Sequence, residues 1–264
     1  MFLPLSDSPN PPGRPYVTYV LIAANLLVYL LVSFPLSSQA PDPQDPVLGA
    51  YVAYLRDALP SDVAVYRALR QASAYDLFIF AHGYKPGDPS VADLFASLFL
   101  HGGLMHLLGN MLFLWIYGDN VEYRLGRAGY LFWYLATGAA ATLFFALFAG
   151  SSMTPLVGAS GAISGVLGFY FVWFPRNRVR VFVMLFPFFM DVVSIPARIV
   201  LGAYLLIDNL FPFLLDAGGA GGGVAYGAHI GGFLTGMLMA VAINRWRRAR
   251  IQNDRSVQPH VSGG

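Results

Sequence analysis

One apolar run, Leu156–Phe174, reads LVGASGAISGVLGFYFVWF and sets the class of the whole chain. It approaches the roughly 20 helical residues that cross a hydrocarbon core of about 30 Å. Near its start, the motif Gly158-Ala159-Ser160-Gly161 places a hydroxyl between glycines, which leave room for a neighbouring backbone. Backbone N–H groups at the start of a helix suit a developing oxyanion. Ser160 is therefore a candidate nucleophile, and a small-residue packing face is the alternative.

A histidine in a second glycine-rich run is the candidate general base. His229 lies in the motif AHIGG of the apolar run Val224–Asn244. Gly232 and Gly236, at i+3 and i+7, share its helical face and favour close contact with the run that carries Ser160. A neutral imidazole is a suitable base for a serine hydroxyl, and no Asp or Glu has an obvious place as a third member. We expect a Ser–His dyad; a histidine that only bonds neighbouring helices is the alternative.

A third polar motif, HGGLMHLLGN, begins with His101 and includes His106 and Asn110. The last two are four residues apart and share a helical face. Two side-chain donors on one face, in a chain with a candidate nucleophile, predict stabilisation of a tetrahedral oxyanion. The motif lacks the His-Glu-x-x-His spacing of a zinc site, and the chain has no cysteine, so we expect no metal and no other cofactor.

The composition predicts an all-α membrane protein embedded in a lipid bilayer. Hydrophobic residues make up 56% of the chain and charged residues only 11%, against about 25% in soluble domains, and the mean hydropathy is +0.57. Glycine and proline inside several apolar runs are tolerated in transmembrane helices. Six runs approach the roughly 20 residues of a spanning helix: Val17–Phe34, Leu94–Gly118, Tyr130–Ala149, Leu156–Phe174, Ile195–Leu215 and Val224–Asn244.

The distribution of arginine predicts the orientation. With six spans, the N-terminus, the loops after spans two and four and the C-terminus share one side, and most arginines lie there. The positive-inside rule then places both termini in the cytoplasm. The first run carries no cleavage motif and no basic leader, so we expect a retained helix and a bacterial cytoplasmic membrane. The expected parts are a cytoplasmic tail (1–16), a membrane domain (17–244) with a long outer segment (35–93), and a basic cytoplasmic tail (245–264).

Shorter segments complete this plan. Within the outer segment, Ala50–Tyr75 has the spacing of one amphipathic helix at the membrane surface. Val179–Ser194 is too short to span separately and is broken by proline, so an interfacial turn or hairpin on the cytoplasmic side is expected. Glu122 and Arg124 follow the second span and are expected to join that loop to neighbouring helix ends. Asp208, in the fifth span, is expected near the outer water level.

The three motifs, in this order on spans two, four and six, make the chain resemble the rhomboid intramembrane serine proteases over nearly all its length past residue 16. The resemblance implies a six-helix, N-in/C-in bundle with a cavity that opens outward and a buried Ser160–His229 dyad. It implies oxyanion donors from His106, Asn110 and the Ser160 backbone N–H. It also implies cleavage of transmembrane protein substrates near the outer membrane boundary, with no nucleic-acid or metal partner. The residues expected to support the site are Gly158, Gly161, Gly232 and His101.

Two positions depart from the family pattern. Many members have an aromatic residue four positions after the nucleophile, beneath the catalytic histidine, where this chain has Ser164; many have Trp-Arg where it has Ala92-Asp93. A small residue at 164 leaves room for a water or for a bulkier neighbour beneath His229, so we expect Ser164 to be tolerated. Two other functions stay open: a catalytically inactive relative that binds or escorts membrane helices, and a small-solute transporter, although the paired repeats of transporters are not found.

Overall fold

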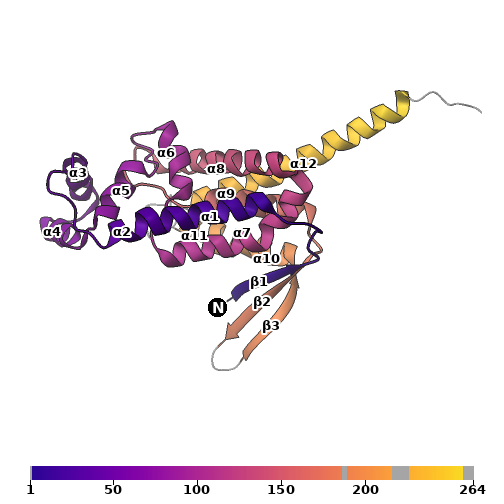
Figure 1. The fold of residues 1–264 in the computed structure, drawn as a ribbon, viewed down its shortest axis with the longest axis horizontal. Coiled ribbons are helices and arrows are strands. Elements are labelled where there is room, and N and C mark those ends of the chain that lie inside the picture. The colour runs from indigo at the N-terminus through magenta and orange to yellow at the C-terminus, as the bar shows by residue number, and fades with distance from the viewer. Residues whose placement is uncertain (1, 186–188, 216–225, 258–264) are drawn as a thin grey trace, which may run out of the picture.

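The computed structural model describes residues 2–185, 189–215 and 226–257, and these are mostly helical (Figure 1). Within these described residues, four helices are long and apolar enough to cross a membrane, or five if a bent pair counts as one span. The four are Tyr16–Ser37, Arg127–Ala149, Ala197–Leu215 and Tyr226–Gln252. The helix that carries Ser160 has 14 residues and falls short of that length. The prediction of a helical membrane protein is confirmed, and the six spans stay a prediction.

The elements of the helical body follow the expected runs with shifted ends. The first run forms α1 (Tyr16–Val28), the π-helical turn η1 (Tyr29–Ser33) and α2 (Phe34–Ser37); the third forms α8 (Arg127–Ala149). The fifth run forms α10 (Ala197–Leu205), the π-helical turn η3 (Leu206–Leu210) and α11 (Phe211–Leu215); the sixth forms α12 (Tyr226–Val257). The sixth helix therefore continues past Asn244, and Figure 1 shows its end projecting from the body. The expected tail is thus helical to Val257, and 258–264 lie outside the described residues.

Two expected spans are interrupted where glycine allows it. The second consists of α6 (Val91–Ala96) and the 3-10 turn η2 (Ser97–Phe99), followed after a bend of 87° by α7 (Leu104–Leu125). His101-Gly102-Gly103 forms this break. The fourth expected run loses its first residues, because α9 (Ser160–Trp173) starts only after Gly158, whose φ is +124°. That conformation favours glycine and is not helical, so the helix cannot include this residue.

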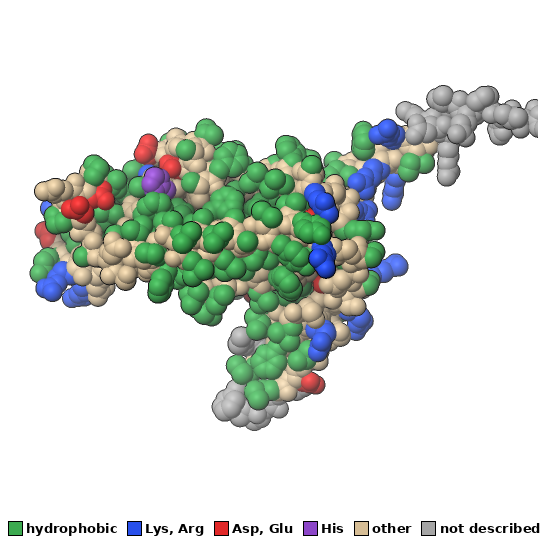
Figure 2. All heavy atoms as spheres, in the orientation of Figure 1, with side chains coloured by type: hydrophobic (Ala, Val, Ile, Leu, Met, Phe, Trp, Pro, Cys, Tyr) green, Lys and Arg blue, Asp and Glu red, His purple; other side chains and the backbone are tan. Residues whose placement is uncertain are grey.

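The helical body buries several polar side chains beside its apolar core and exposes many apolar side chains on its outside. On the first helix Thr18 and Asn25 are buried, whereas Val20 is 64% and Leu31 is 72% exposed. Figure 2 shows hydrophobic side chains covering the lateral surface of the body, with Lys and Arg gathered toward its ends. A soluble domain rarely exposes an apolar surface of this extent. This distribution is therefore the one expected of helices that face lipid.

A three-stranded antiparallel sheet corrects the all-α expectation. The strands β1 (Phe2–Ser8), β2 (Arg178–Leu185) and β3 (Phe189–Pro196) lie in the order β1-β2-β3. Of the turn or hairpin expected within 179–194, the antiparallel strand pairing is present and residues 186–188 lie outside the described residues. The first residues of the expected tail form a strand. On β2, Val179, Val181 and Val183 are buried and alternate with exposed Arg178 and Arg180, which is the period of a strand. We call the end of the body that meets these strands the sheet end (Figure 1).

At the opposite end, the outer segment forms three short helices instead of the single one expected over 50–75. They are α3 (Leu48–Ala58), α4 (Asp62–Gln71) and α5 (Ala74–His82). Pro60 separates the first two, and Ser61 caps the second by accepting a hydrogen bond from the Ala64 N–H. Ser73 and Asp76 form a capping box that starts the third. These capping residues can be recognised in the sequence. They start new helices at positions where the amphipathic spacing alone predicts one continuous helix.

The helices α9 and α12 pack through their glycines, as the spacing predicted. A Cβ added to Gly232 would overlap the carbonyl oxygen of Gly161, and one added to Gly236 would overlap that of Gly165. The two backbones are therefore in direct contact along one face. This contact fixes the start of α12 beside the start of α9, where the candidate nucleophile and base lie.

Candidate active site

The structure brings Ser160 and His229 into hydrogen-bond contact. The serine is the first residue of α9, and its Oγ lies 2.8 Å from the Nε2 of His229, in the first turn of α12. Both side chains are partly exposed, while the neighbouring Ala159 and Ala228 are buried. The distance and the pair of atoms are those needed for proton transfer from a hydroxyl to an imidazole. The expected pairing of these two helices is thus present.

Gly158 brings a second imidazole to the same place. A Cβ at this position would lie 2.8 Å from His106 Nε2 and 3.6 Å from Ser160 Oγ. Its positive φ already disfavours any other residue, and its N–H donates to the Ser97 carbonyl at 2.9 Å. The absence of a side chain therefore lets the His106 ring approach the backbone next to the nucleophile. The first glycine of the GASG motif is therefore needed for the approach of His106, and not only for helix packing.

Asn110 lies one turn after His106 on α7, and it is buried with 8% exposure. Its Nδ2 has no hydrogen-bond partner among the described residues. A buried amide donor without a partner is costly, which makes the position notable in an apolar helix. His101 is more deeply buried, its ring centroid is 5.2 Å from that of His106, and its backbone N–H and C=O both bond the Tyr75 hydroxyl. The outer segment thus holds the bend between η2 and α7.

Two residues of the fifth helical run contact the site, and sequence reasoning passed over both. Asn209 Oδ1 lies 2.7 Å from His229 Nδ1, and Tyr204 Oη lies 2.8 Å from Ser164 Oγ. A third member of a catalytic triad is usually an acid, and Asp208, the acid in this run, is exposed. An asparagine in an apolar run is the signal that was available. It is a weak signal, because amides also bond their own helix.

The loop that leads to the nucleophile is held from the outer segment. Leu156 and Tyr84 exchange backbone hydrogen bonds of 2.8 and 3.1 Å, and a Cβ on Gly83 would lie 2.6 Å from the Pro155 side chain. Ala92 and Asp93, where the family pattern has Trp-Arg, lie in the first turn of α6. The Asp93 N–H donates to Ser90, which caps that helix. The departure therefore alters a helix start and leaves the dyad unaffected.

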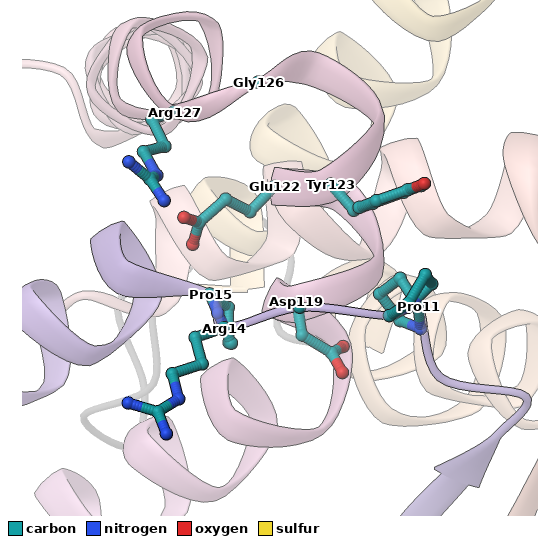
Figure 3. Close-up of a pocket in the computed structure, with 10 residues that line it drawn as sticks. Pro11, Arg14, Pro15, Asp119, Glu122, Tyr123, Gly126 and Arg127 are labelled. Atoms are coloured by element: carbon teal, nitrogen blue, oxygen red, sulfur yellow. The ribbon is translucent and has the colours of Figure 1, made fainter.

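A recess of about 260 Å³ at the sheet end is separate from this site. Figure 3 shows Glu122 beside it, and its carboxylate accepts hydrogen bonds from the Thr18 N–H and hydroxyl, both at 2.8 Å. The carboxylate thus satisfies the free N–H groups at the start of α1. Arg124 donates to Asn244 Oδ1 at 3.0 Å and joins α7 to α12. The expectation that these two charged residues join helix ends is confirmed.

The comparisons with known proteins agree with this architecture. The family model for the rhomboid domain matches residues 88–246, which is more than half of the chain. The chain belongs to the rhomboid family. It is therefore a multi-pass membrane protein, and all three polar motifs fall within the matched residues. Within the described part of this rhomboid protein, no group of three or more His, Asp or Glu side chains could hold a metal ion.

Several rhomboid relatives share about 30% of their residues with this chain. "Rhomboid protein 1, mitochondrial" of Saccharomyces cerevisiae is 30% identical over 174 residues, covering 62% of this chain and 46% of the relative. "Rhomboid protease GluP" of Bacillus subtilis is 32% identical over 151 residues, covering 57% of this chain and 25% of the relative. "Rhomboid protease GlpG" of Yersinia pseudotuberculosis is 28% identical over 143 residues, covering 54% and 44%. The chain thus spans less than half the length of each of these relatives.

Proposed function

We propose that this rhomboid protein is an intramembrane serine endopeptidase that cleaves transmembrane proteins near the outer membrane boundary. The observation that carries the proposal is the 2.8 Å contact between Ser160 Oγ and His229 Nε2, at the start of two helices held together by glycine. A hydroxyl and an imidazole among apolar helices are costly to keep there without a use. Two of the relatives are named rhomboid proteases, which supports the same conclusion.

In the proposed reaction, Ser160 Oγ attacks the carbonyl carbon of the substrate bond while its proton passes to His229 Nε2. The imidazolium then gives that proton to the leaving amine, and water releases the acyl group by the same steps. The carbonyl oxygen becomes an oxyanion, for which three donors are proposed. Among the residues that the structure describes, the Asn110 Nδ2 is buried without a partner, the His106 ring lies against Gly158, and a helix start leaves the Ser160 N–H free.

We further propose six spans, with α9 as a short fourth one and with both termini in the cytoplasm. A helix of 14 residues is about 21 Å long, against a hydrocarbon core of about 30 Å. If α9 ends at the cytoplasmic boundary, Ser160 lies roughly 10 Å below the outer one. The membrane is proposed to be the cytoplasmic membrane of a bacterium, as two relatives are bacterial, although others are mitochondrial or from plants.

The substrate must present an open peptide bond at that depth. A carbonyl inside an α-helix is hydrogen-bonded and shielded, so the substrate helix has to unwind locally before attack. Small or helix-breaking residues lower the cost of unwinding by up to about 1 kcal/mol per glycine and about 3 kcal/mol per proline. We therefore propose substrates whose outer transmembrane ends contain such residues.

Substitution of the dyad tests the proposal. Ser160→Ala and His229→Ala should each abolish nearly all cleavage of a reconstituted membrane substrate, and the double variant should be little worse, because the two act as a unit. Ser151→Ala, an exposed serine in the preceding loop, is the matched control and should cleave normally. Thermal unfolding of each variant checks the fold. Full activity in a stable Ser160→Ala protein would end the protease proposal, and additive partial losses would assign the proton transfer to another base.

An inactive relative that binds or escorts membrane helices is the alternative, although Ser160 and His229, whose loss would mark such a relative, are both present. A fluorophosphonate probe separates the two functions, because it reacts with an activated serine and needs no substrate. Labelling of the purified protein that is lost in both Ser160→Ala and His229→Ala supports the enzyme. An unlabelled, folded wild-type protein supports the escort.

A further inference from the structure

We infer that Asn209 is a positioning residue for the general base, so that the site is a Ser160–His229–Asn209 chain and not an isolated dyad. The inference rests on the proposed function and adds a residue to it. Asn209 is 2% exposed, and its Oδ1 lies 2.7 Å from His229 Nδ1, on the side of the ring opposite the serine. One imidazole therefore has both nitrogens engaged, each by a side chain from a different helix.

The bond that Asn209 makes to its own helix determines the donor and acceptor of each hydrogen bond from Asn209 through His229 to Ser160. Asn209 Nδ2 donates to the Tyr204 carbonyl at 2.8 Å, so the amide oxygen is the atom that faces the imidazole. An amide oxygen only accepts, so His229 Nδ1 must carry the proton. Nε2 is then left with its lone pair directed at the Ser160 hydroxyl, 2.8 Å away. The asparagine thus selects the tautomer that can act as a base.

The backbone supplies the geometry through the π-helical turn η3. A π-helical turn within an α-helix shifts the side chains that follow it, and such turns are frequent at functional sites. Here the turn Leu206–Leu210 turns Asn209 inward while Asp208, one residue earlier, is exposed. The buried side chain is therefore the neutral amide. Burying an amide is less costly than burying a carboxylate next to a base that must lose its proton again.

Tyr204 fills the space next to the same imidazole from one turn earlier in the chain. Its ring centroid is 6.4 Å from that of His229, with an angle of 31° between the ring planes, and its hydroxyl lies 2.8 Å from Ser164 Oγ. Ser164 is fully buried four residues after the nucleophile, where a larger side chain would occupy the place of the tyrosine. The small side chain at 164 thus leaves the space that the large side chain at 204 occupies. The bulkier neighbour expected beneath His229 is supplied by α10.

These contacts predict a specific effect on the reaction. A base with an unfixed tautomer presents Nε2–H to the serine for part of the time, and its ring is free to turn away. Loss of the Asn209 contact should therefore lower kcat more than it alters KM. The loss should be at least about 10-fold and smaller than the roughly 10²–10⁴-fold that a general base contributes as a whole.

The experiment compares Asn209→Ala, Asn209→Asp and Asn25→Ala in the full-length protein. Asn25 is the matched control, because it is a buried asparagine whose Nδ2 also bonds its own helix, to the Leu21 carbonyl at 2.8 Å, and it lies on α1, which carries none of the site residues. We expect a lower kcat in Asn209→Ala and an unchanged kcat in Asn25→Ala. In Asn209→Asp the carboxylate stabilises the imidazolium, so activity should persist and the acid limb of the kcat/KM profile should move to higher pH.

A second readout does not depend on cleavage. Nitrogen-15 spectra of labelled histidine report which ring nitrogen carries the proton, and the His229 signals are identified by their loss in His229→Ala. The wild-type protein should show a protonated Nδ1, and Asn209→Ala should lose that preference. If the spectra change as expected while no variant cleaves substrate, the proposed function fails and the positioning contact stands. A His229 tautomer and a pH profile that are the same with and without Asn209 would overturn the inference.

The exchange of residues 164 and 204 tests the second contact. Tyr204→Ala should lower kcat by removing the ring next to His229, and the double variant Ser164→Tyr/Tyr204→Ala should recover part of it by supplying the ring from α9. Ser164→Tyr alone should unfold at a lower temperature, because both rings then compete for one space. Equal activity of Tyr204→Ala and the wild-type protein would show that the tyrosine does not position the base.

Discussion

At the scale of single residues, the donors around Ser160 differ in how they are held. Asn110 is buried and its Nδ2 has no partner among the residues described, whereas His106 is exposed and rests against Gly158. A donor that is already desolvated needs no further reorganisation when charge develops beside it. The His106 ring is less enclosed, so its position is less fixed before charge develops. Asn110 should therefore contribute more to transition-state stabilisation than His106.

Substitution of these two donors tests that order. Loss of one oxyanion donor typically lowers the rate by about 10²–10³-fold, or roughly 2.7–4 kcal/mol. Asn110→Ala should lie in this range and His106→Ala at or below its lower limit, both through kcat and not KM. Asn120→Ala, a buried asparagine on the same helix that bonds Asp7, is the control and should keep its kcat. Normal turnover in both Asn110→Ala and His106→Ala would show that these residues only pack helices.

The residues that the sequence revealed, and the one it did not, differ in the kind of contact they make. Ser160 and His229 lie in motifs whose glycines make the contacts that bring them together, and Gly158 of the serine motif also leaves room for the His106 ring. Residue type and spacing therefore pointed to the site. Asn209 has no such local signature. Its contact with His229 depends on a π-helical turn and on the placement of one helix against another, and neither follows from the residues around it.

At the scale of elements, the first strand is joined to the helical body through a buried carboxyl group. Asp7 on β1 accepts hydrogen bonds from the Tyr170 hydroxyl and from Asn120 Nδ2, the latter at 2.9 Å. Burial raises the pKa of the Asp7 carboxyl from 3.8 to about 6; the Tyr170 hydroxyl opposes this rise and the nearby Asp119 adds to it. The strand is thus held in place by a group that titrates close to neutral pH.

This carboxyl predicts a pH-dependent stability. Because its pKa is raised in the folded state, the folded protein binds the proton more tightly, and stability falls as pH rises from about 4 to about 6 and is level above. Asp7→Asn keeps an acceptor for both donors and removes the ionisation. It should therefore raise the free energy of unfolding at pH 7.5 by about 1–3 kcal/mol and flatten the pH dependence.

Thermal unfolding in detergent at pH 4.5 and 7.5 measures this effect, with Asp191→Asn, an exposed aspartate on β3, as the control. The control should keep the pH dependence of the wild-type protein. If Asp7→Asn shows the same difference between the two pH values as the wild type, the buried carboxyl does not govern the attachment of the strand.

The elements that sequence reasoning missed are those set by non-local pairing or by local breaks. Hydrophobic runs identified every helix of the body, because each must satisfy its backbone internally and cover itself with apolar side chains. The strand β1 pairs with residues about 175 positions later in the chain, for example Phe2 with Val183, and no local pattern reports such a partner. The break before α7 and the late start of α9 occur at glycines, and the mean hydropathy of a run does not show which glycines interrupt a helix.

At the scale of the whole molecule, the charges distinguish the two ends of the body. At the sheet end the Arg124 guanidinium lies 4.6 Å from the centre of the Trp173 ring, and that of Arg127 lies 4.5 Å from the centre of the Tyr16 ring. Arginine stacked on aromatic rings at one level is typical of the cytoplasmic interface of a membrane protein. The opposite end carries the long outer segment, in which charge constrains orientation only weakly. The sheet end should therefore face the cytoplasm.

Single cysteines in this cysteine-free chain test the orientation. Ser38 and Ala249 are exposed and lie beyond opposite ends of the body, after α2 and near the end of α12. In spheroplasts, a membrane-impermeant maleimide should label Ser38→Cys and leave Ala249→Cys unlabelled, and both should react once the membrane is opened, which controls for accessibility. Labelling of Ala249→Cys alone in intact spheroplasts would show that the orientation is the reverse of the one proposed. The Ser160–His229 site, which lies on the side of Ser38, would then open to the cytoplasm, and its substrates would have to be cleaved at the inner boundary instead of the outer one.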